Sequence, residues 1–144
     1  KIKYNDKILH QSKILKYFVE GDDKKKVQKD IDKIFKKILK NKKYFISAKD
    51  LALADTLISD GFSLPDNFKY EELSKKFEIP NNLLKLIDNE QKAFLSLKIV
   101  EIIGEDEVAN LDSETIYFIT NLLNRSNLIK LRNEILLSAL PQRT

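Results

Sequence analysis

The sequence contains no cysteine and no methionine, and it has only one histidine, three glycines and three prolines in 144 residues. The absence of cysteine excludes disulfides, thiolate metal sites and cysteine nucleophiles. A single histidine, His10, rules out most histidine-based metal and acid–base sites. So few glycines and prolines exclude collagen, flexible linkers and sandwiches rich in tight hairpins. With 42% hydrophobic and 33% charged residues, the composition is that of a globular domain.

The chain begins with Lys1 and lacks an initiator methionine, so we expect it to be a fragment of a longer chain. A membrane-spanning helix needs about 20 apolar residues in succession. The longest apolar stretch, residues 94–103, is about half that length and contains Ser96, Lys98 and Glu101. We therefore expect a soluble protein without a membrane span, from the cytoplasm or the bacterial periplasm.

Charge is distributed unevenly along the chain. Residues 1–46 carry 15 lysines and six acidic residues, a net charge of +9, whereas residues 47–144 carry a net charge of −5. A chain of 144 residues is also long enough for one compact domain and too short for two of ordinary size. We predict a single helical domain over residues 1–144, made of a basic helix pair (1–46) and a mildly acidic helical remainder (47–144).

Residues that end helices recur at intervals of about 20. They are Gly21, Asn41, Gly61, Pro80, Gly104, Asn124 and Pro141. Good N-cap residues follow at Asp22 or Asp23, Ser47, Asp66, Asp112 and Ser126. Between these expected helix starts and stops, the apolar residues repeat with a helical period. No stretch alternates between apolar and polar residues for long enough to form a strand. The pattern predicts an all-α fold of seven to eight helices.

Two helices stand out within this pattern. Residues 47–60 begin with Ser47 and Asp50 in the spacing of a capping box. Residues 90–103 are the most apolar segment, and their wide apolar arc predicts a central helix that is nearly surrounded. We therefore expect the centre of the core at Phe94, Leu95, Ile99 and Ile102.

Two architectures fit these helices. Gly21, Gly61 and Gly104 are 40 and 43 residues apart, a spacing typical of the helix pairs of armadillo or HEAT repeats. The chain would then be a short α-solenoid of about three helix pairs. The alternative is an irregular multi-helix bundle whose spacing reflects ordinary helix lengths.

The segment from residue 51 to residue 143 also carries a resemblance. The residues that carry it are Leu51-Ala52-Leu53-Ala54-Asp55, Gly61, Leu64-Pro65, Phe94-Leu95-Ser96-Leu97 and Leu137-Ser138-Ala139-Leu140-Pro141. This segment resembles the C-terminal helical-repeat region of uncharacterised α-proteobacterial proteins that are thought to be exported. The resemblance implies a helical-repeat architecture and a location in the bacterial envelope, and it implies no chemistry.

No pattern in the sequence predicts catalysis, a cofactor or a metal site. Phosphate-binding glycine loops and the common zinc and nucleophile motifs are missing. The acidic pairs and triplets at residues 71–72 and 105–107 fall at expected helix ends, where carboxylates are solvated or cap a helix. The acidic residues after residue 105 also lack the spacing of a calcium-binding loop.

The most positive signal is a lysine-rich helix face between residues 24 and 43. We predict a partner-binding surface made of Lys25, Lys29, Lys33, Lys36, Lys40 and Tyr44. The expected function is a non-enzymatic helical protein–protein interaction or scaffold domain whose partner is a protein, and an acidic protein would complement the lysines. The alternative is a nucleic-acid-binding module in which Tyr44 and Phe45 stack on bases, although residues 1–46 contain no arginine for reading base edges. A merely solvated lysine face, or contact with an anionic membrane surface, also remains open.

Overall fold

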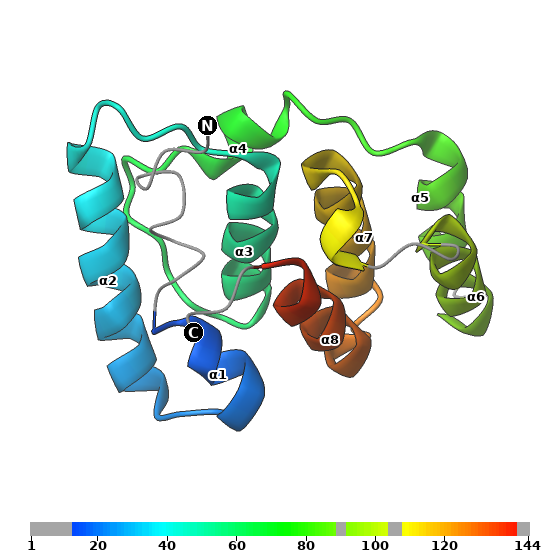
Figure 1. The fold of residues 1–144 in the computed structure, drawn as a ribbon, viewed down its shortest axis with the longest axis horizontal. Coiled ribbons are helices and arrows are strands. Elements are labelled where there is room, and N and C mark those ends of the chain that lie inside the picture. The colour runs from blue at the N-terminus through cyan, green and yellow to red at the C-terminus, as the bar shows by residue number, and fades with distance from the viewer. Residues whose placement is uncertain (1–12, 89–91, 104–107, 141–144) are drawn as a thin grey trace.

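The computed structural model describes residues 13–88, 92–103 and 108–140, and it is helical throughout, without a strand in these ranges. The elements are α1 (Leu15–Glu20), α2 (Lys24–Lys40), α3 (Ala48–Ser59), α4 (Tyr70–Ser74), α5 (Asn81–Asp88), α6 (Lys92–Ile103), the 3-10 turn η2 (Val108–Asn110), α7 (Ser113–Arg125) and α8 (Ile129–Ala139) (Figure 1). These eight α-helices confirm the predicted all-α fold. The expectations for His10, Gly104, Pro141 and the acidic residues 105–107 lie outside the described residues.

Several helix ends follow directly from the local sequence. The predicted capping box at the start of α3 is complete, because the Ser47 hydroxyl accepts a hydrogen bond from the Asp50 N–H (3.2 Å) and the Asp50 carboxylate accepts one from the Ser47 N–H (2.9 Å). Gly21 and Gly61 follow α1 and α3 with φ angles of 68° and 91°, which glycine adopts most readily.

The expected stop at Asn124 is wrong, because that residue lies inside α7. The chain reverses instead around Asn127, whose φ of 56° is left-handed. Ser126, predicted to start a helix, closes α7, and α8 begins three residues later at Ile129. Asparagine tolerates the left-handed conformation, so either asparagine was a plausible stop, and tertiary packing selects the second.

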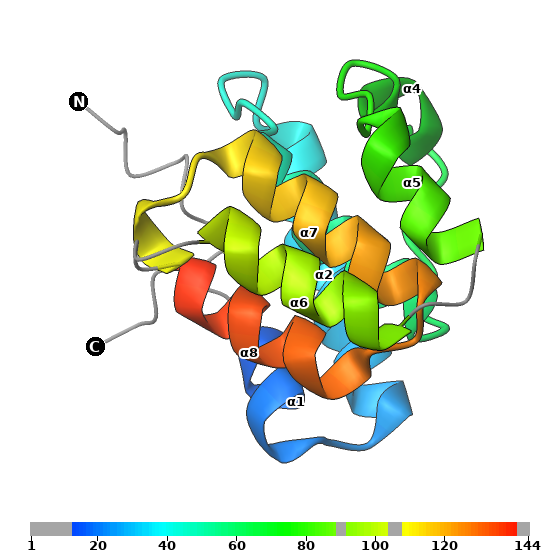
Figure 2. The same ribbon diagram turned by 90° about the vertical axis from the view of Figure 1, so that its right-hand side faces the viewer.

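The helices lie in successive layers whose spatial order differs from their order in the chain. α2 and α1 lie at one end of the molecule, α3 follows, then α7 with α8, and α6 lies at the far end beside α5 (Figure 1). Figure 2 shows α6 running alongside α7 and α8. Consecutive helix pairs of a solenoid would stack in chain order. Here α7 and α8 lie between α3 and α6, so the architecture is an irregular bundle.

The centre of the core is α3. Its residues Leu51, Ala52, Leu53, Ala54 and Leu57 are at most 1% exposed. The apolar stripe of α2 packs in the same cluster through Val27, Ile31, Phe35 and Ile38. Small alanine side chains allow neighbouring helices to approach closely, which suits a helix that is enclosed on several sides.

The prediction that residues 90–103 form the central helix is wrong. Leu95 and Ile99 are buried as expected, against Ile119 and Leu122 of α7, but Ile102 is only half-buried and Phe94 is 54% exposed. The wide apolar arc of α6 has one covered side and one open side, because α6 is the outermost layer. The number of apolar residues on a helix does not determine how many neighbours the helix has.

None of the helices within the described ranges combines the length and the hydrophobicity that a transmembrane span requires.

Candidate functional site

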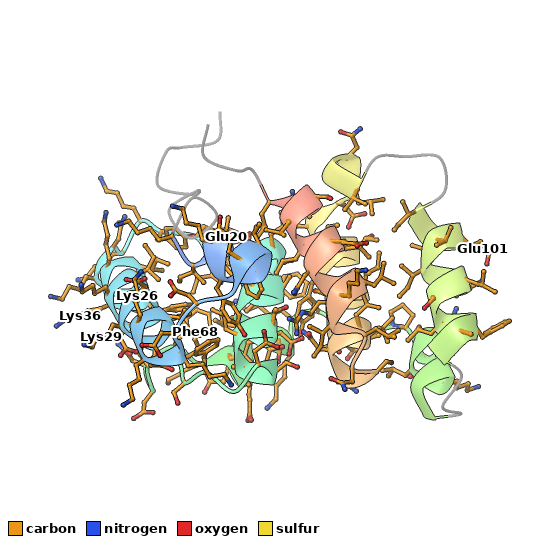
Figure 3. All side chains as sticks on the ribbon, turned by 90° about the horizontal axis from the view of Figure 1, so that it is seen from below. Glu20, Lys26, Lys29, Lys36, Phe68 and Glu101 are labelled. Atoms are coloured by element: carbon orange, nitrogen blue, oxygen red, sulfur yellow. The ribbon has the colours of Figure 1, made fainter. Side chains whose placement is uncertain are left out.

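The five lysines predicted to bind a partner lie together on the outer side of α2. With about 100° of rotation per residue, they fall within an arc of about 80°, opposite the buried stripe of the same helix. All five are exposed. Figure 3 shows Lys29 and Lys36 pointing away from the protein at this end of the molecule. We call this set the basic surface: Lys25, Lys29, Lys33, Lys36 and Lys40.

The positive charge of the basic surface is not neutralised by ion pairs within the part of the chain that the structure describes. Among the residues that the structure describes, none of the five ammonium groups forms an ion pair. The nearby pair of Lys26 with Asp22 (3.3 Å) lies at the start of the helix. From Lys25 to Lys40 the surface extends over about 22 Å at 1.5 Å per residue. It is therefore a linear array of free positive charges.

The helix that carries this surface is held firmly against the rest of the domain. Asp23 caps its first turn by accepting a hydrogen bond from the Lys25 N–H (3.2 Å). Gln28 exchanges two hydrogen bonds with the backbone of Ser63, at 2.8 and 3.0 Å, and so joins α2 to the loop after α3. On the buried side, the Phe35 ring packs edge-on against Phe68 (centroids 5.0 Å apart). A fixed helix presents its charges at fixed spacing.

The structure separates the roles of the two aromatic residues that follow this helix. Tyr44 is half-buried, and its hydroxyl donates a hydrogen bond to the Asp50 carboxylate in the first turn of α3 (3.2 Å). Phe45 is 75% exposed. Tyr44 thus helps to hold α3 in place, and Phe45 is the aromatic side chain that solvent reaches. The predicted partner-binding role of Tyr44 stays a prediction.

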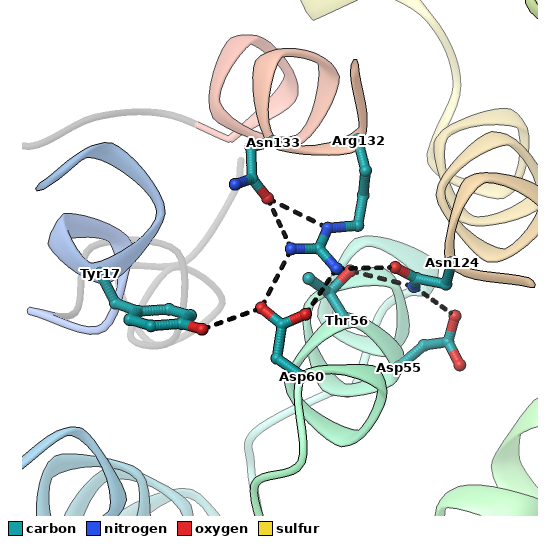
Figure 4. A network of polar contacts seen from close by, with 7 residues as sticks. All are labelled: Tyr17, Asp55, Thr56, Asp60, Asn124, Arg132 and Asn133. Carbon is teal, nitrogen blue, oxygen red and sulfur yellow. Dashed lines mark hydrogen bonds and ion pairs between the residues drawn. The ribbon is translucent and has the colours of Figure 1, made fainter. Parts of the chain in front are cut away.

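A buried polar network, which the sequence did not reveal, joins α3 to α8. The Arg132 guanidinium is 1% exposed and donates to both oxygens of Asp60, at 2.7 and 3.0 Å (Figure 4). It also donates to Asn133 Oδ1 and Asn124 Oδ1, and it lies over the Phe18 ring at 5.9 Å. Arginine is suited to this place because its planar donors match a carboxylate in pairs.

The network continues to a second carboxylate on α3. Asn124 donates from Nδ2 to Asp55 (2.8 Å), which also accepts from Asn121 Nδ2 and from the Tyr70 hydroxyl, each at 3.0 Å. The Tyr70 and Tyr117 hydroxyls share a hydrogen bond of 3.0 Å. Burial, with the Asp55 charge, raises the pKa of Tyr70 well above its ordinary value, so Tyr70 stays neutral.

These groups line a pocket of about 390 Å³ between α3, α4 and α7. The Asp55 carboxylate accepts hydrogen bonds from three side chains, and a neutral tyrosine is a poor general base near pH 7. Asn121 is 6% exposed and its Nδ2 is turned toward Asp55, so that its Oδ1 has no hydrogen-bond partner among the described residues. The arrangement is that of a structural network that fixes α4, α7 and α8 on α3.

The sequence holds one signal of this network. Arg132, Asn121 and Asp55 each stand in a helix beside apolar core residues, at positions where a charge or an amide is costly unless it finds partners. Helical periodicity alone does not say which of them face one another. Within the described residues, no three histidine, cysteine, aspartate or glutamate side chains are grouped to hold a metal ion.

Comparisons of the chain with protein-family models, with curated proteins and with solved structures found no match. The resemblance of residues 51–143 to α-proteobacterial helical-repeat proteins therefore stays a prediction.

Proposed function

We propose that the chain is a non-enzymatic interaction domain that docks on an acidic protein through the basic surface of α2. The observation that carries this proposal is the line of five exposed ammonium groups on one arc of a firmly held helix, none of them in an ion pair with another described residue. A partner with carboxylates along a helix or an extended segment would meet them over about 22 Å. Complementary charge of this kind accelerates association and selects partners, more than it adds raw affinity.

A non-enzymatic role is supported by how the buried polar groups are used. Asp55 and Asp60 are both engaged by side-chain donors from other helices, and Tyr70 stays neutral. Catalytic carboxylates usually have a lone pair or a proton available to a substrate in a cleft. The titratable groups of this network are committed to one another.

Nucleic-acid binding is the second candidate, and the exposed Phe45 favours it. Its ring follows Lys42 and Lys43, and aromatic rings beside lysines form stacking platforms for single strands. The basic surface contains lysine alone, which supplies charge without the bidentate contacts by which arginine reads guanine. We expect only nonspecific nucleic-acid binding, with Kd of roughly 10⁻⁴ to 10⁻⁶ M at physiological salt.

A titration by fluorescence anisotropy tests the proposal. The probes are a labelled glutamate-rich peptide long enough to span the basic surface, a single-stranded oligonucleotide and a duplex, each at about 0.15 M salt. The test variant is K33E/K36E, at the centre of the surface. The matched control is K75E/K76E, which makes the same change of net charge at two exposed lysines just after α4.

We expect the peptide to bind the parent and the control alike, and K33E/K36E to weaken that binding at least tenfold. Equal loss in both variants would mean that net charge alone attracts the peptide, and it would contradict a defined docking surface. Nanomolar binding of an oligonucleotide that K33E/K36E abolishes would instead establish the nucleic-acid function.

A further inference from the structure

The outer side of α6 carries an apolar ridge formed by Phe94, Leu97 and Val100, which are 54%, 68% and 61% exposed. The opposite side of the same helix is buried through Leu95 and Ile99. The ridge spans an arc of about 120° at 100° per residue. A helix that is apolar on two opposite sides is typical of a position between two packed layers. The fold supplies one of these layers.

A groove runs beside the ridge, between α6 and the start of α8. It has a volume of about 580 Å³, and its lining consists of Ser96 on α6 with Asn127, Leu128, Ile129, Lys130, Leu131 and Glu134 at the start of α8. Ile129 is 44% exposed. The same face of the molecule thus carries a projecting apolar ridge and, next to it, a hollow lined by three apolar and four polar or charged residues. A surface with both features can pair with a copy of itself.

The charges around the ridge also suit a second copy. The charged side chains on this face include Lys98 and Glu101 of α6, which form an ion pair of 3.1 Å, and Lys130 and Glu134 beside the groove. These four described side chains carry two positive and two negative charges, so together they favour neither an acidic nor a basic partner. When two identical helices pair antiparallel, the same flank of each faces the other, so Lys98 of one copy lies near Glu101 of its partner.

The positions of the two surfaces in the molecule point the same way. The helices that carry the two surfaces, α2 and α6, lie at opposite ends of the layered bundle, as Figures 1 and 3 show. Pairing through α6 keeps the two basic surfaces of a dimer at its outer ends, where their mutual repulsion is weakest. Pairing through α2 would bring ten lysines together.

We propose that two copies of the chain associate through α6 about a two-fold axis, with the two α6 helices antiparallel and their ridges packed against each other. Such an interface is isologous, because the same residues contribute from both copies. It provides the second layer that the apolar pattern of α6 requires. The pairing does not depend on the basic surface.

The available area sets the expected strength. Each of the three ridge side chains and Ile129 exposes on the order of 100 Å² of apolar surface. Burying all four in both copies removes about 800 Å² of apolar surface from water. If about 65% of the interface is apolar, the total is about 1,200 Å², the lower limit for specific interfaces. We therefore expect a dimer that forms at roughly 10–100 µM.

Sedimentation velocity over a concentration series tests the proposal. We expect the parent chain to shift from monomer to dimer as its concentration rises through that range. V100E places a carboxylate in the middle of the interface and should raise the dimer Kd at least tenfold. V19E is the matched control, because Val19 on α1 is 63% exposed and lies away from α6. It should leave the Kd unchanged.

A charge swap adds a readout that general destabilisation does not give. K98E places two glutamates on each facing flank and should weaken the dimer, and K98E/E101K should restore it. Circular dichroism should show the same helix content for every variant, since all the altered side chains are partly or largely exposed. The proposal would be overturned if the parent chain stays monomeric to about 500 µM, or if V19E and V100E raise the dimer Kd equally. The ridge would then be expected to bind a different protein.

Discussion

Arg132 and Asp60, 72 residues apart in the chain, form a bidentate ion pair that is almost completely removed from solvent, with N–O distances of 2.7 and 3.0 Å. The pair joins the end of α3 to α8 across the middle of the bundle (Figure 4). Each partner has further hydrogen bonds, from the Tyr17 hydroxyl to Asp60 and from Arg132 to Asn133. Burying two charges is costly, so a pair of this kind persists only when its geometry and its remaining hydrogen bonds are satisfied.

Removing one partner of this pair should be strongly destabilising. R132M leaves the Asp60 carboxylate buried without its cation, and we expect it to lower the free energy of unfolding by about 3–5 kcal/mol. D60L should do the same by stranding the guanidinium. Urea denaturation of the parent, both single variants and the double variant measures the effect.

The double variant D60L/R132M is the informative control. Two apolar side chains in contact leave no uncompensated charge, so its loss should be smaller than the sum of the single losses by about 1–3 kcal/mol. Additivity within about 0.5 kcal/mol would show that the two residues act independently.

Leu95 and Phe94 are neighbours in the chain with opposite environments, and they should respond very differently to truncation. L95A empties a site that is 1% exposed and should cost about 2–5 kcal/mol. F94A removes a side chain that is 54% exposed and should cost well under half of the loss for L95A. Thermal or urea unfolding at about 1 µM, below the expected dimer range, checks both. A larger loss of stability for F94A than for L95A would contradict the outer position of α6 and support the prediction that it is the central helix.

The buried tyrosines should make the protein less stable in alkali. The pKa of Tyr70 is raised by burial and by the Asp55 charge, and burial also raises the pKa of Tyr117. In the unfolded chain both ionise near pH 10. Their stabilising contribution is therefore complete below about pH 10 and is lost as the pH rises toward their folded values, because the unfolded state releases its protons first.

An absorbance titration of tyrosinate at alkaline pH, run beside the unfolding curve, measures this effect. Tyr70 and Tyr117 should ionise together with unfolding and not before it. Y70F removes one of these protons, so stability should fall less steeply with pH than in the parent. Ionisation of Tyr70 at its ordinary pKa in the folded protein would contradict its burial beside Asp55.

Much of the local structure was predictable from the sequence. The structure has the predicted helix caps at Asp23, Ser47 and Asp112 and the predicted helix stops at Gly21 and Gly61. These features are predictable because each depends on contacts within a few residues. The lysine arc of α2 was predictable for the same reason. Once a segment is helical, its 3.6-residue period fixes which side chains share a face, and the buried stripe of α2 decides which face is turned outward.

The sequence by itself thus determined the helices, most of their ends and the basic surface, while the tertiary structure decided which helix lies at the centre. The apolar arc of α6 shows only that this helix can be buried on several sides. The helix that is enclosed is α3, because α7 and α8, which come late in the chain, pack between α3 and α6. The same packing brings Arg132 to Asp60 and Asn124 to Asp55. Contacts between residues some 70 positions apart depend on how whole helices are layered, and no local period encodes that order.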